Sequence, residues 1–360
     1  MADTQLSDFK IKSQIHDYEV CFVDDLDTSL DAELIEGDFI VIDKKIKELY
    51  SDSFSKILGK FRYIVIEASE VQKSYEGVIP VLNSLMTEGF KKNHRLVAVG
   101  GGITQDVTAF IASILYRGVD WLFYPTSLLA QGDSCIGSKT SINFREFKNQ
   151  VGGFYPPRKV FIYPEFVNSL PQSEIQSGMG EMLHYFIVSG KEDFDFYKRL
   201  YKSAFKNKND LQKIIQKSLQ IKKAYIEKDE FDKHIRQVFN YGHSFGHAIE
   251  SLTNYSIPHG VAVSFGMDLS NYVSMRMGLI EPHIREEIRE VTSYIWNGYS
   301  ISSLDYEKLI QALGRDKKNV GTQLGLILNK GYGKIFKELV DPREPFNTWI
   351  KDYFQEIKAR

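Results

Sequence analysis

The stretch Leu96-Val-Ala-Val-Gly100-Gly101-Gly102-Ile-Thr-Gln-Asp106 decides the fold expected of this chain. A short apolar run leads into three glycines and then into residues with helical spacing. Such a turn places bare backbone N–H groups and a helix N-terminus where a phosphate or pyrophosphate can bind. The spacing is not Gly-x-Gly-x-x-Gly, and glycine-rich turns also serve packing, so both interpretations stay open at this point.

The alternation of strand and helix extends across the first half of the chain. Short apolar runs predict strands at residues 18–23, 39–42, 63–66, 96–99 and 121–124, and helical spacing follows at residues 78–90 and 106–116. This order predicts a mostly parallel sheet covered by helices, an α/β domain. Asp43 ends an early strand, where a carboxylate can bind ribose hydroxyls, although a solvated turn aspartate fits equally well.

From about Pro171 the pattern changes to helices alone. Helical spacing occurs at residues 175–188, 211–227, 238–252, 261–277, 284–295, 304–313 and 346–357. We therefore expect an all-α second half. Because 360 residues exceed one ordinary core, the sequence predicts two domains, residues 1–168 and 169–360.

Composition argues against several classes of protein. The chain is 43% hydrophobic and 26% charged with a formal net charge of -2, so it lacks the basic excess that nucleic-acid binding favours. Its two cysteines, Cys21 and Cys135, fit a reducing cytosol better than a disulfide framework. The polar start lacks the features of a signal peptide, and no apolar run approaches the ~20 residues of a membrane span. We expect a cytoplasmic protein with neither a nucleic-acid nor a membrane partner.

A polar, glycine-punctuated segment spans residues 125–158. It is too long and too mixed for a simple connection, and long irregular loops in compact domains are usually functional. Its candidates for contacting a charged substrate are Asp133, Lys139, Lys148 and Asn149. As isolated surface charges these residues would carry no function.

Residues 236–259 hold three of the eight histidines. His243 and His247 lie four apart and project from one face of a helix, and the turn at Pro258-His259-Gly260 could fold a third imidazole towards them. The arrangement outlines a metal site, although histidine pairs at this spacing also occur as surface or core residues.

Two glycines and a carboxylate strengthen this outline. Gly242 and Gly246 are costly inside a helix, which suggests the close approach of a ligand or of another backbone. Glu181 lies in an otherwise apolar helical stretch, and a buried carboxylate must be paired or bound to metal. Glu181 with His243 and His259 would give the ligand mix of open, catalytic zinc sites.

The chain resembles the 3-dehydroquinate synthases and their sugar-phosphate cyclase relatives. The matching motifs occur in the same order over roughly residues 40–320 and include Gly100-Gly-Gly…Asp106, Arg117-Gly118, Pro125-Thr126, Asp133-Ser, Lys139-Thr, Lys148-Asn149, Gly180-Glu181, Lys222…Asp229-Glu230…Arg236…Asn240-Tyr-Gly-His243…His247-Ala-Ile-Glu250, His259-Gly and Asp316-Lys-Lys318.

The resemblance implies a Rossmann-like NAD-binding α/β domain followed by a helical metal-binding domain, and usually a homodimer. It implies that Glu181, His243 and His259 hold a zinc or cobalt ion. The residues that it places along the dinucleotide are Asp43, Glu70, Lys73, Gly101, Gly102, Asp106, Thr126, Ser127, Ser169 and Glu174.

The resemblance also implies a substrate site. It places Lys139, Asn149, Asn240, His247 and one of Lys317 or Lys318 at the substrate phosphate, with Arg117 reaching in from the partner subunit. Arg236 and Lys222 would clamp a carboxylate, and Asp133, Lys148 and His184 complete the expected catalytic set. The implied reaction is the NAD- and metal-dependent cyclisation of a phosphorylated keto-sugar acid with phosphate elimination, from 3-deoxy-D-arabino-heptulosonate 7-phosphate to 3-dehydroquinate.

Four positions depart from the family pattern. His184 stands where the motif Glu-x-x-Lys has lysine, and Val261 stands where His-Gly-Glu has glutamate, which removes a carboxylate near an expected ligand. Ser138 replaces a loop glycine before Lys139, and residues 43–45 read Asp-Lys-Lys instead of Asp-x-Asn. Retention of Arg236 favours a substrate with a carboxylate.

Three alternatives remain open from the sequence. A variant cyclase that makes a valiolone-like, inosose-like or aminated carbocycle is favoured by His184 and Val261 and opposed by Arg236 with Lys222. A metal-dependent polyol dehydrogenase would show net NADH production. A degenerate cyclase serving as a binding or scaffold protein would hold neither metal nor NAD.

Overall fold

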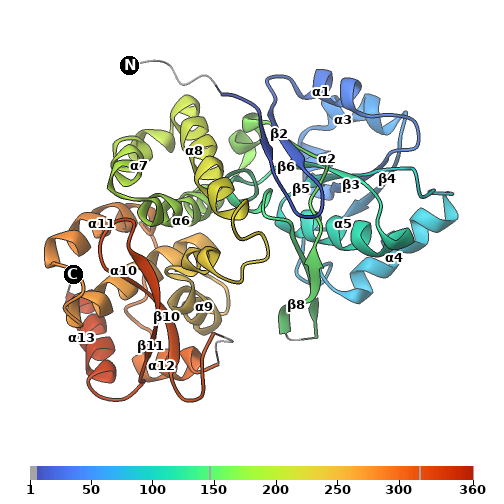
Figure 1. Cartoon of the computed structure of the whole chain (residues 1–360). Coiled ribbons are helices and arrows are strands. Elements are labelled where there is room, and N and C mark those ends of the chain that lie inside the picture. Colours follow the sequence, from blue (N-terminus) through green and yellow to red (C-terminus); the bar gives the residue numbers. More distant parts are fainter. Residues whose placement is uncertain (1–5, 146, 316–317, 360) are drawn as a thin grey trace. The chain divides into compact units, whose positions relative to one another are not determined.

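The structure is a computed structural model that describes residues 6–145, 147–315 and 318–359 (Figure 1). The chain forms two compact units, Met1–Leu170 with Lys222–Phe231, and Pro171–Ile221 with Asp232–Arg360. It therefore passes from one unit to the other three times. The first crossing lies two residues after the predicted boundary at residue 168, and no sequence pattern indicates that residues 222–231 belong with the first unit.

The first unit is built on a seven-stranded sheet with the strand order β1-β2-β9-β6-β5-β3-β4. All neighbouring strands are parallel except β1 and β2. Strands β3, β5 and β6 are buried along their whole length, as expected of central parallel strands. The strands are β1 (Phe9–Ile11), β2 (Tyr18–Phe22), β3 (Phe39–Asp43), β4 (Arg62–Ile66), β5 (Leu96–Gly100), β6 (Trp121–Pro125) and β9 (Lys159–Ile162).

Helices cover both faces of this sheet (Figure 1). Leu26, Leu30, Phe54 and Ile57 of α1 and α3 pack on alternate residues of β3, β5 and β6, such as Ile42. Helices α4 and α5 cover the opposite face. The helices are α1 (Leu26–Glu33), α2 (Lys44–Leu49), α3 (Ser51–Leu58), α4 (Tyr75–Thr87), α5 (Gly102–Ile114) and the 3-10 turns η1 (Leu115–Arg117) and η3 (Pro164–Ser169).

The polar segment 125–158 is more regular than predicted. A π-helical turn, η2 (Ala130–Ser134), leads into a two-stranded antiparallel hairpin of β7 (Lys139–Phe144) and β8 (Phe147–Phe154). The expectation of an irregular loop was wrong because a two-stranded ribbon with polar side chains shows little hydrophobic alternation.

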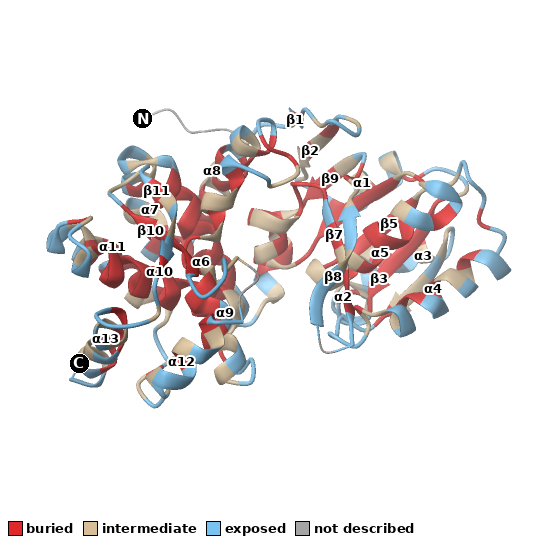
Figure 2. Cartoon of the chain, turned by 60° about the horizontal axis from the view of Figure 1, so that its bottom comes forward, coloured by how far each residue is buried: buried red, intermediate tan, exposed pale blue. Residues whose placement is uncertain are grey.

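The second unit is mainly helical, as predicted. Helices α6 and α10 form its centre, and both are almost wholly buried (Figure 2). The helices are α6 (Gln172–Ser189), α7 (Lys191–Ala204), α8 (Lys208–Ile226), η4 (Ile235–Asn240), α9 (His243–Leu252), α10 (His259–Arg276), α11 (Pro282–Ile295), α12 (Tyr306–Leu313) and α13 (Phe346–Ala359). Residues 222–226 at the end of α8 belong to the first unit. Among the described residues, no helix combines the length and apolarity that crossing a membrane requires.

One hairpin in this unit corrects the expectation of an all-α second half. Strand β10 (Leu324–Asn329) pairs antiparallel with β11 (Ile335–Val340). Every residue of β10 is buried, whereas β11 is buried mainly at its ends. Leu324, Leu326 and Leu328 extend the core formed with α9 and α10.

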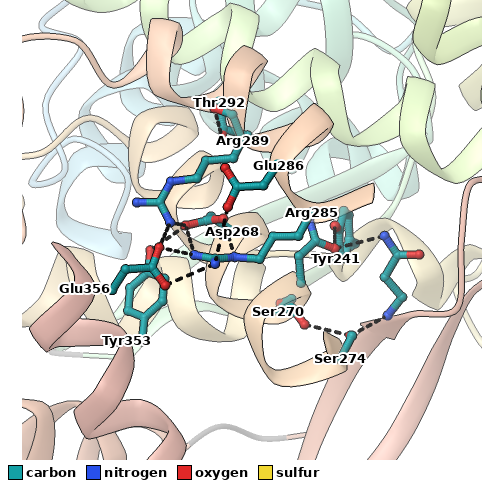
Figure 3. Close-up of polar contacts among 12 residues, drawn as sticks. Tyr241, Asp268, Ser270, Ser274, Arg285, Glu286, Arg289, Thr292, Tyr353 and Glu356 are labelled. Atoms are coloured by element: carbon teal, nitrogen blue, oxygen red, sulfur yellow. Dashed lines mark hydrogen bonds and ion pairs between the residues drawn. The ribbon is translucent and has the colours of Figure 1, made fainter. Parts of the chain in front are cut away.

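A buried ion network fastens three helices of the unit to one another (Figure 3). Asp268 on α10 lies 3.1 Å from both Arg285 and Arg289 on α11 and accepts a hydrogen bond from Tyr353 on α13 at 3.0 Å. Glu356, also on α13, lies 2.6 Å from Arg289. The carboxylate of Asp268 is thus neutralised within the core, as burial of a charge requires.

Candidate metal, dinucleotide and substrate sites

Close helix crossings build the polar centre of the second unit. A Cβ atom on Gly260 would lie 1.8 Å from the Ser177 carbonyl oxygen, so only glycine lets α10 approach α6 this closely. A Cβ on Gly246 would lie 3.0 Å from the Cα of Val263. The glycines beside the histidine pair therefore serve the approach of another backbone, one of the two interpretations that the sequence left open.

These crossings bring Glu181, His243 and His259 together. Their candidate ligand atoms all lie within 4.8 Å of one another. Nε2 of His243 lies 3.2 Å from Oε1 of Glu181, and Nε2 of His259 lies 3.5 Å from Oε2. Two imidazoles and a carboxylate from α6, α9 and α10 are a donor set that suits a divalent zinc-like ion.

The remaining nitrogen of each imidazole is held by an oxygen atom. Nδ1 of His243 lies 3.3 Å from the Tyr241 carbonyl, and Nδ1 of His259 lies 3.1 Å from the carboxylate of Glu250. Both rings therefore direct Nε2 at Glu181. No described residue donates a hydrogen bond to the buried Oε2 of Glu181, so the residues present fit a bound cation.

The imidazoles also set the ionisation of the cluster. Burial by itself would raise the pKa of Glu181, but His243, His184 and His259 outweigh it and hold that pKa well below its usual value of 4.5. The carboxylate is thus charged and ready to bind a cation at neutral pH.

His247 lies beside the cluster rather than within it. Its ring centroid is 5.6 Å from that of His243 and 5.7 Å from that of His259. Desolvation, followed by the positive charges of His243, His259 and Lys318, lowers the pKa of His247 well below 6.5. With Glu250 and His259 it forms a second group with metal-binding spacing.

Two positions that depart from the family pattern are fully buried. The His184 ring lies 3.9 Å from that of Tyr185, centroid to centroid, and its Nδ1 lies 3.8 Å from Glu181. Val261 belongs to an apolar cluster with Phe245 and Ile249. The second unit thus has an imidazole beside the metal cluster and no carboxylate at position 261.

Three further candidates of the substrate set lie in the second unit. Arg236 and Asn240 belong to η4, which directly precedes α9; Arg236 is buried, and Asn240 donates a hydrogen bond to the Gln237 carbonyl at 3.1 Å. The charge of Lys318 acts on His247. Lys317 lies outside the described residues.

In the first unit, the carboxyl ends of three parallel strands carry the residues expected at the dinucleotide. Ile42 of β3 pairs with Val99 of β5, which places Asp43 next to Gly100. Gly100 pairs in turn with Pro125 of β6, so Thr126 follows at the same edge. Ligands in open parallel sheets bind at this edge, next to the point where the strand order reverses.

The glycines at this edge differ in purpose. A Cβ on Gly100 would lie 2.3 Å from Oγ1 of Thr104, so Gly100 is required for packing. A Cβ on Gly101 would lie 3.3 Å from Oγ of Ser127, whereas one on Gly102 would meet nothing within 4 Å. Helix α5 begins there with no side-chain cap. The open space and the uncapped N–H groups fit an anionic group such as a pyrophosphate.

Glu70, Lys73 and Asp106 converge beside this helix. Lys73 Nζ lies 2.6 Å from the Asp106 carboxylate, and Asn143 donates a hydrogen bond to Glu70 at 2.7 Å. Tyr50 donates to Ser169 at 3.1 Å. These contacts order the region around the expected dinucleotide.

Asp43 and Glu174 differ from the other members of the dinucleotide set. Asp43 caps α2 by accepting hydrogen bonds from the N–H groups of Lys45 and Ile46, so its Oδ1 atom has a structural use as well. Glu174 is exposed in the first turn of α6 and is the member of the set that belongs to the second unit.

The hairpin carries two of the candidate phosphate contacts. Lys139 and Ser141 lie two residues apart on β7, so their side chains share a face, and Ser141 donates a hydrogen bond to Asn149 at 3.1 Å. Lys139 and Asn149 are therefore on the same face of the hairpin. Lys148 lies 3.7 Å from Glu70, nearer the dinucleotide set.

Lys222 and Asp133 form an ion pair within the first unit. Nζ of Lys222 donates to Oδ1 of Asp133 at 2.7 Å and to its carbonyl oxygen at 2.6 Å. Lys222 is buried, in agreement with its position on the apolar stripe of its helix.

Arg117 is exposed at the end of the 3-10 turn η1. It and Tyr116 have positive φ angles of 65° and 51°. Positive φ angles in residues other than glycine cost about 1–2 kcal/mol each.

Sequence reasoning gave no role to Glu250 and Glu230. Glu250 shares a helical face with His243 and His247, seven and three residues earlier, so the spacing could have found it. Glu230 contacts Ser138 and residues 13–14. The partners are about ninety and about two hundred residues apart in the sequence, so no local sequence pattern predicts these contacts.

Comparisons with known proteins agree with this geometry. Family models described as 3-dehydroquinate synthase N-terminal and 3-dehydroquinate synthase C-terminal match residues 63–177 and 178–319. A 3-dehydroquinate synthase from Alkaliphilus metalliredigens is 32% identical over 309 residues, covering 85% of this chain and 87% of that protein.

Two solved structures share the fold. The structure of 2-deoxy-scyllo-inosose synthase complexed with carbaglucose-6-phosphate, NAD+ and Co2+ has a TM-score of 0.85 at 23% identity and covers 97% of this chain and 100% of its own. The 2-epi-5-epi-valiolone synthase from Streptomyces hygroscopicus subsp. jinggangensis 5008, with NAD+ and Zn2+ bound, has a TM-score of 0.83 at 24% identity and covers 99% of both chains.

Proposed function

Because the chain belongs to the 3-dehydroquinate synthase family, we propose that it cyclises 3-deoxy-D-arabino-heptulosonate 7-phosphate to 3-dehydroquinate with elimination of phosphate. The observation that carries this proposal is the meeting of Glu181, His243 and His259, which offers an open site for zinc or cobalt. We expect the reaction to take place in the cytoplasm.

The two cofactors divide the redox chemistry. A divalent ion held by Glu181, His243 and His259 would polarise a substrate hydroxyl, and bound NAD would supply reversible hydride transfer, so that no net NADH would form. Gly101, Gly102 and the N-terminus of α5 would hold the pyrophosphate of NAD, and Asp43 would bind a ribose hydroxyl.

The chain's own side chains hold the substrate and move its protons. Arg236 binds the substrate carboxylate through its planar fork, and Lys222, oriented by Asp133, supplies a second positive charge. Lys139 and Asn149 on the hairpin bind the phosphate. His247, whose pKa is lowered, would accept the proton from the carbon next to the ketone and return it to the departing phosphate.

The proposed assembly is a homodimer in which Arg117 serves the partner's site. Exposed apolar side chains lie near Arg117: the hydroxyl of Tyr116 lies 3.9 Å from the sulfur of Met86, and Tyr116, Met86 and Ile114 are all exposed. Exposed apolar side chains beside an exposed arginine suit contact with a second copy of the chain.

A second candidate is a cyclase for a carboxylate-free sugar phosphate. It is favoured by His184, an imidazole where the family motif has a lysine ammonium. Retention of Arg236 opposes it, because a substrate without a carboxylate gives that residue nothing to bind.

Phosphate release from a panel of substrates tests the proposal. Purified protein loaded with zinc and NAD should release phosphate from 3-deoxy-D-arabino-heptulosonate 7-phosphate, without accumulating NADH. Release from sedoheptulose 7-phosphate or glucose 6-phosphate alone would replace the proposal with the second candidate. Net NADH formation from glycerol-like alcohols would indicate a polyol dehydrogenase instead.

A further inference from the structure

Two residues directly before Lys139 have a left-handed backbone. Gly137 has a φ of 108° and Ser138 a φ of 64°. Glycine adopts this region freely, whereas an L residue such as serine pays about 1–2 kcal/mol. Serine at position 138, where the family pattern has glycine, is therefore conformationally unfavourable unless a hydrogen bond of its hydroxyl group offsets this cost.

The hydroxyl of Ser138 has a specific partner. It donates a hydrogen bond of 2.7 Å to Oε1 of Glu230, and both residues are buried. Glu230 also accepts hydrogen bonds of 2.7 Å from the Ser13 hydroxyl and from the Gln14 N–H. A charge-assisted hydrogen bond in a buried place contributes about 1.5–3 kcal/mol, enough to offset the conformational cost.

The backbone around Ser138 is held on both sides. The Gly137 N–H donates to the hydroxyl of the buried Tyr18 at 3.0 Å, and the Ser138 carbonyl accepts from the N–H of Tyr155 at 2.6 Å. Lys139 is the next residue and opens β7, opposite Phe154. The φ angle at Ser138 therefore sets the direction in which the chain enters the strand and presents Lys139.

We propose that Ser138 and Glu230 are positioning residues for Lys139, and that their hydrogen bond holds this lysine in the place where it binds the substrate phosphate. The inference rests on the proposed function for the role of Lys139. It makes Glu230, far away in sequence, a determinant of substrate affinity.

Ser13 provides a matched control because it donates to the same oxygen of Glu230 at the same distance. Its removal likewise takes one hydroxyl hydrogen bond from Glu230, but it leaves the contact between Glu230 and the loop before Lys139 in place. A purely structural role of the hydroxyl groups predicts that Ser13→Ala and Ser138→Ala behave alike.

The test compares kcat and KM for the sugar phosphate in Ser138→Ala, Ser138→Gly, Glu230→Gln and Ser13→Ala. Ser138→Ala keeps the strain and loses the hydrogen bond, so its KM should rise about three- to tenfold with little change in kcat. Ser138→Gly relieves the strain and should recover part of this loss. Ser13→Ala should leave KM unchanged, and adding Glu230→Gln to Ser138→Ala should raise KM no further.

Hydrogen exchange at residues 136–142 gives a readout independent of turnover. Exchange of the Lys139 and Thr140 amides should be faster in Ser138→Ala and Glu230→Gln but not in Ser13→Ala. An unchanged KM and unchanged exchange in Ser138→Ala, or equal effects in both serine variants, would overturn the inference. A wild-type protein that releases no phosphate from any sugar phosphate would instead overturn the proposed function, and the exchange data would still decide the role of Ser138.

Discussion

Glu250 determines which nitrogen of His259 is available to a metal ion. Its carboxylate accepts a hydrogen bond from Nδ1 of His259 at 3.1 Å. This leaves Nε2, which lies beside Glu181, as the unprotonated nitrogen whose lone pair can bind a metal ion. Contacts of this kind commonly raise ligand basicity and fix ring orientation. In this chain a side chain of α9 supplies the carboxylate, while position 261 is apolar.

Glu250→Gln should weaken zinc binding by about ten- to a hundredfold, because the amide no longer fixes the ring through a negative charge. Competition with a chromogenic chelator measures the affinity, and the visible spectrum of the Co2+ form reports the ligand geometry. Glu290→Gln, at an exposed glutamate of α11, is the control and should match the wild type. Equal affinities in all three proteins would contradict this role.

The two histidines of α9 should separate in function. His243→Ala removes a donor of the Glu181 cluster and should lose bound metal, whereas His247→Ala should retain metal and lose turnover. Elemental analysis after dialysis, together with phosphate release, distinguishes the two outcomes. Equal loss of metal in both variants would show instead that the ion is held by His247, Glu250 and His259, which also have metal-binding spacing.

For individual residues, the sequence was sufficient to expect a cluster of Glu181 with the histidines, but not to predict specific side-chain contacts. The spacing of His243 and His247 and the apolar surroundings of Glu181 were sufficient to expect a cluster. The partnerships of Lys222 with Asp133 and of Ser138 with Glu230 join residues 89 and 92 positions apart. Only the folded chain defines such pairs, because local patterns carry no information about them.

Helices α6 and α10 can cross closely because both have glycine, which lacks a side chain, at the point of contact. Gly180 and Gly260 face each other, and a Cβ on either would lie about 2 Å from an opposing carbonyl oxygen. This contact places Glu181 and His259 at the crossing itself. The metal cluster is therefore tied to helix packing, not to a flexible loop.

Gly260→Ala should destabilise the protein by about 1–3 kcal/mol or more, since overpacking must push the helices apart. It should also weaken metal binding, because the separation moves His259 from Glu181. Gly153→Ala is the matched control, since a Cβ there meets nothing within 4 Å. Urea unfolding of the metal-free proteins measures their stability. A Gly260→Ala protein as stable as the wild type would contradict the claim that the close approach of α6 and α10 requires glycine.

Both hairpins are among the elements that the sequence analysis did not predict, together with strands β1 and β9 and helices α1, α2, α3 and α7. The five predicted strands of the sheet and most of the long helices have clear apolar patterns, whereas Lys139–Phe154 is a polar ribbon. Strand β10 is buried at every position, and an unbroken apolar run of six residues does not distinguish a strand from a helix. Both hairpins form because tertiary packing decides between the alternatives.

For the whole molecule, a complementation experiment tests the proposed dimer. Arg117→Ala and His243→Ala should each be inactive alone. If Arg117 serves the partner's site, a mixed dimer contains one intact site, and refolding the variants together in equal amounts should restore about a quarter of wild-type activity. Activity that stays absent in the mixture, with mixed dimers demonstrated, would place Arg117 in its own subunit's site.

The three crossings of the chain between its units have a consequence for dividing the gene. A fragment ending at Leu170 would lack Lys222–Phe231, and with it the buried acid that receives Ser13, Gln14 and Ser138. A fragment beginning at Pro171 would carry that segment without the surface on which it packs. Neither half is a self-sufficient module, so recombination between relatives must exchange the first unit and this ten-residue segment together.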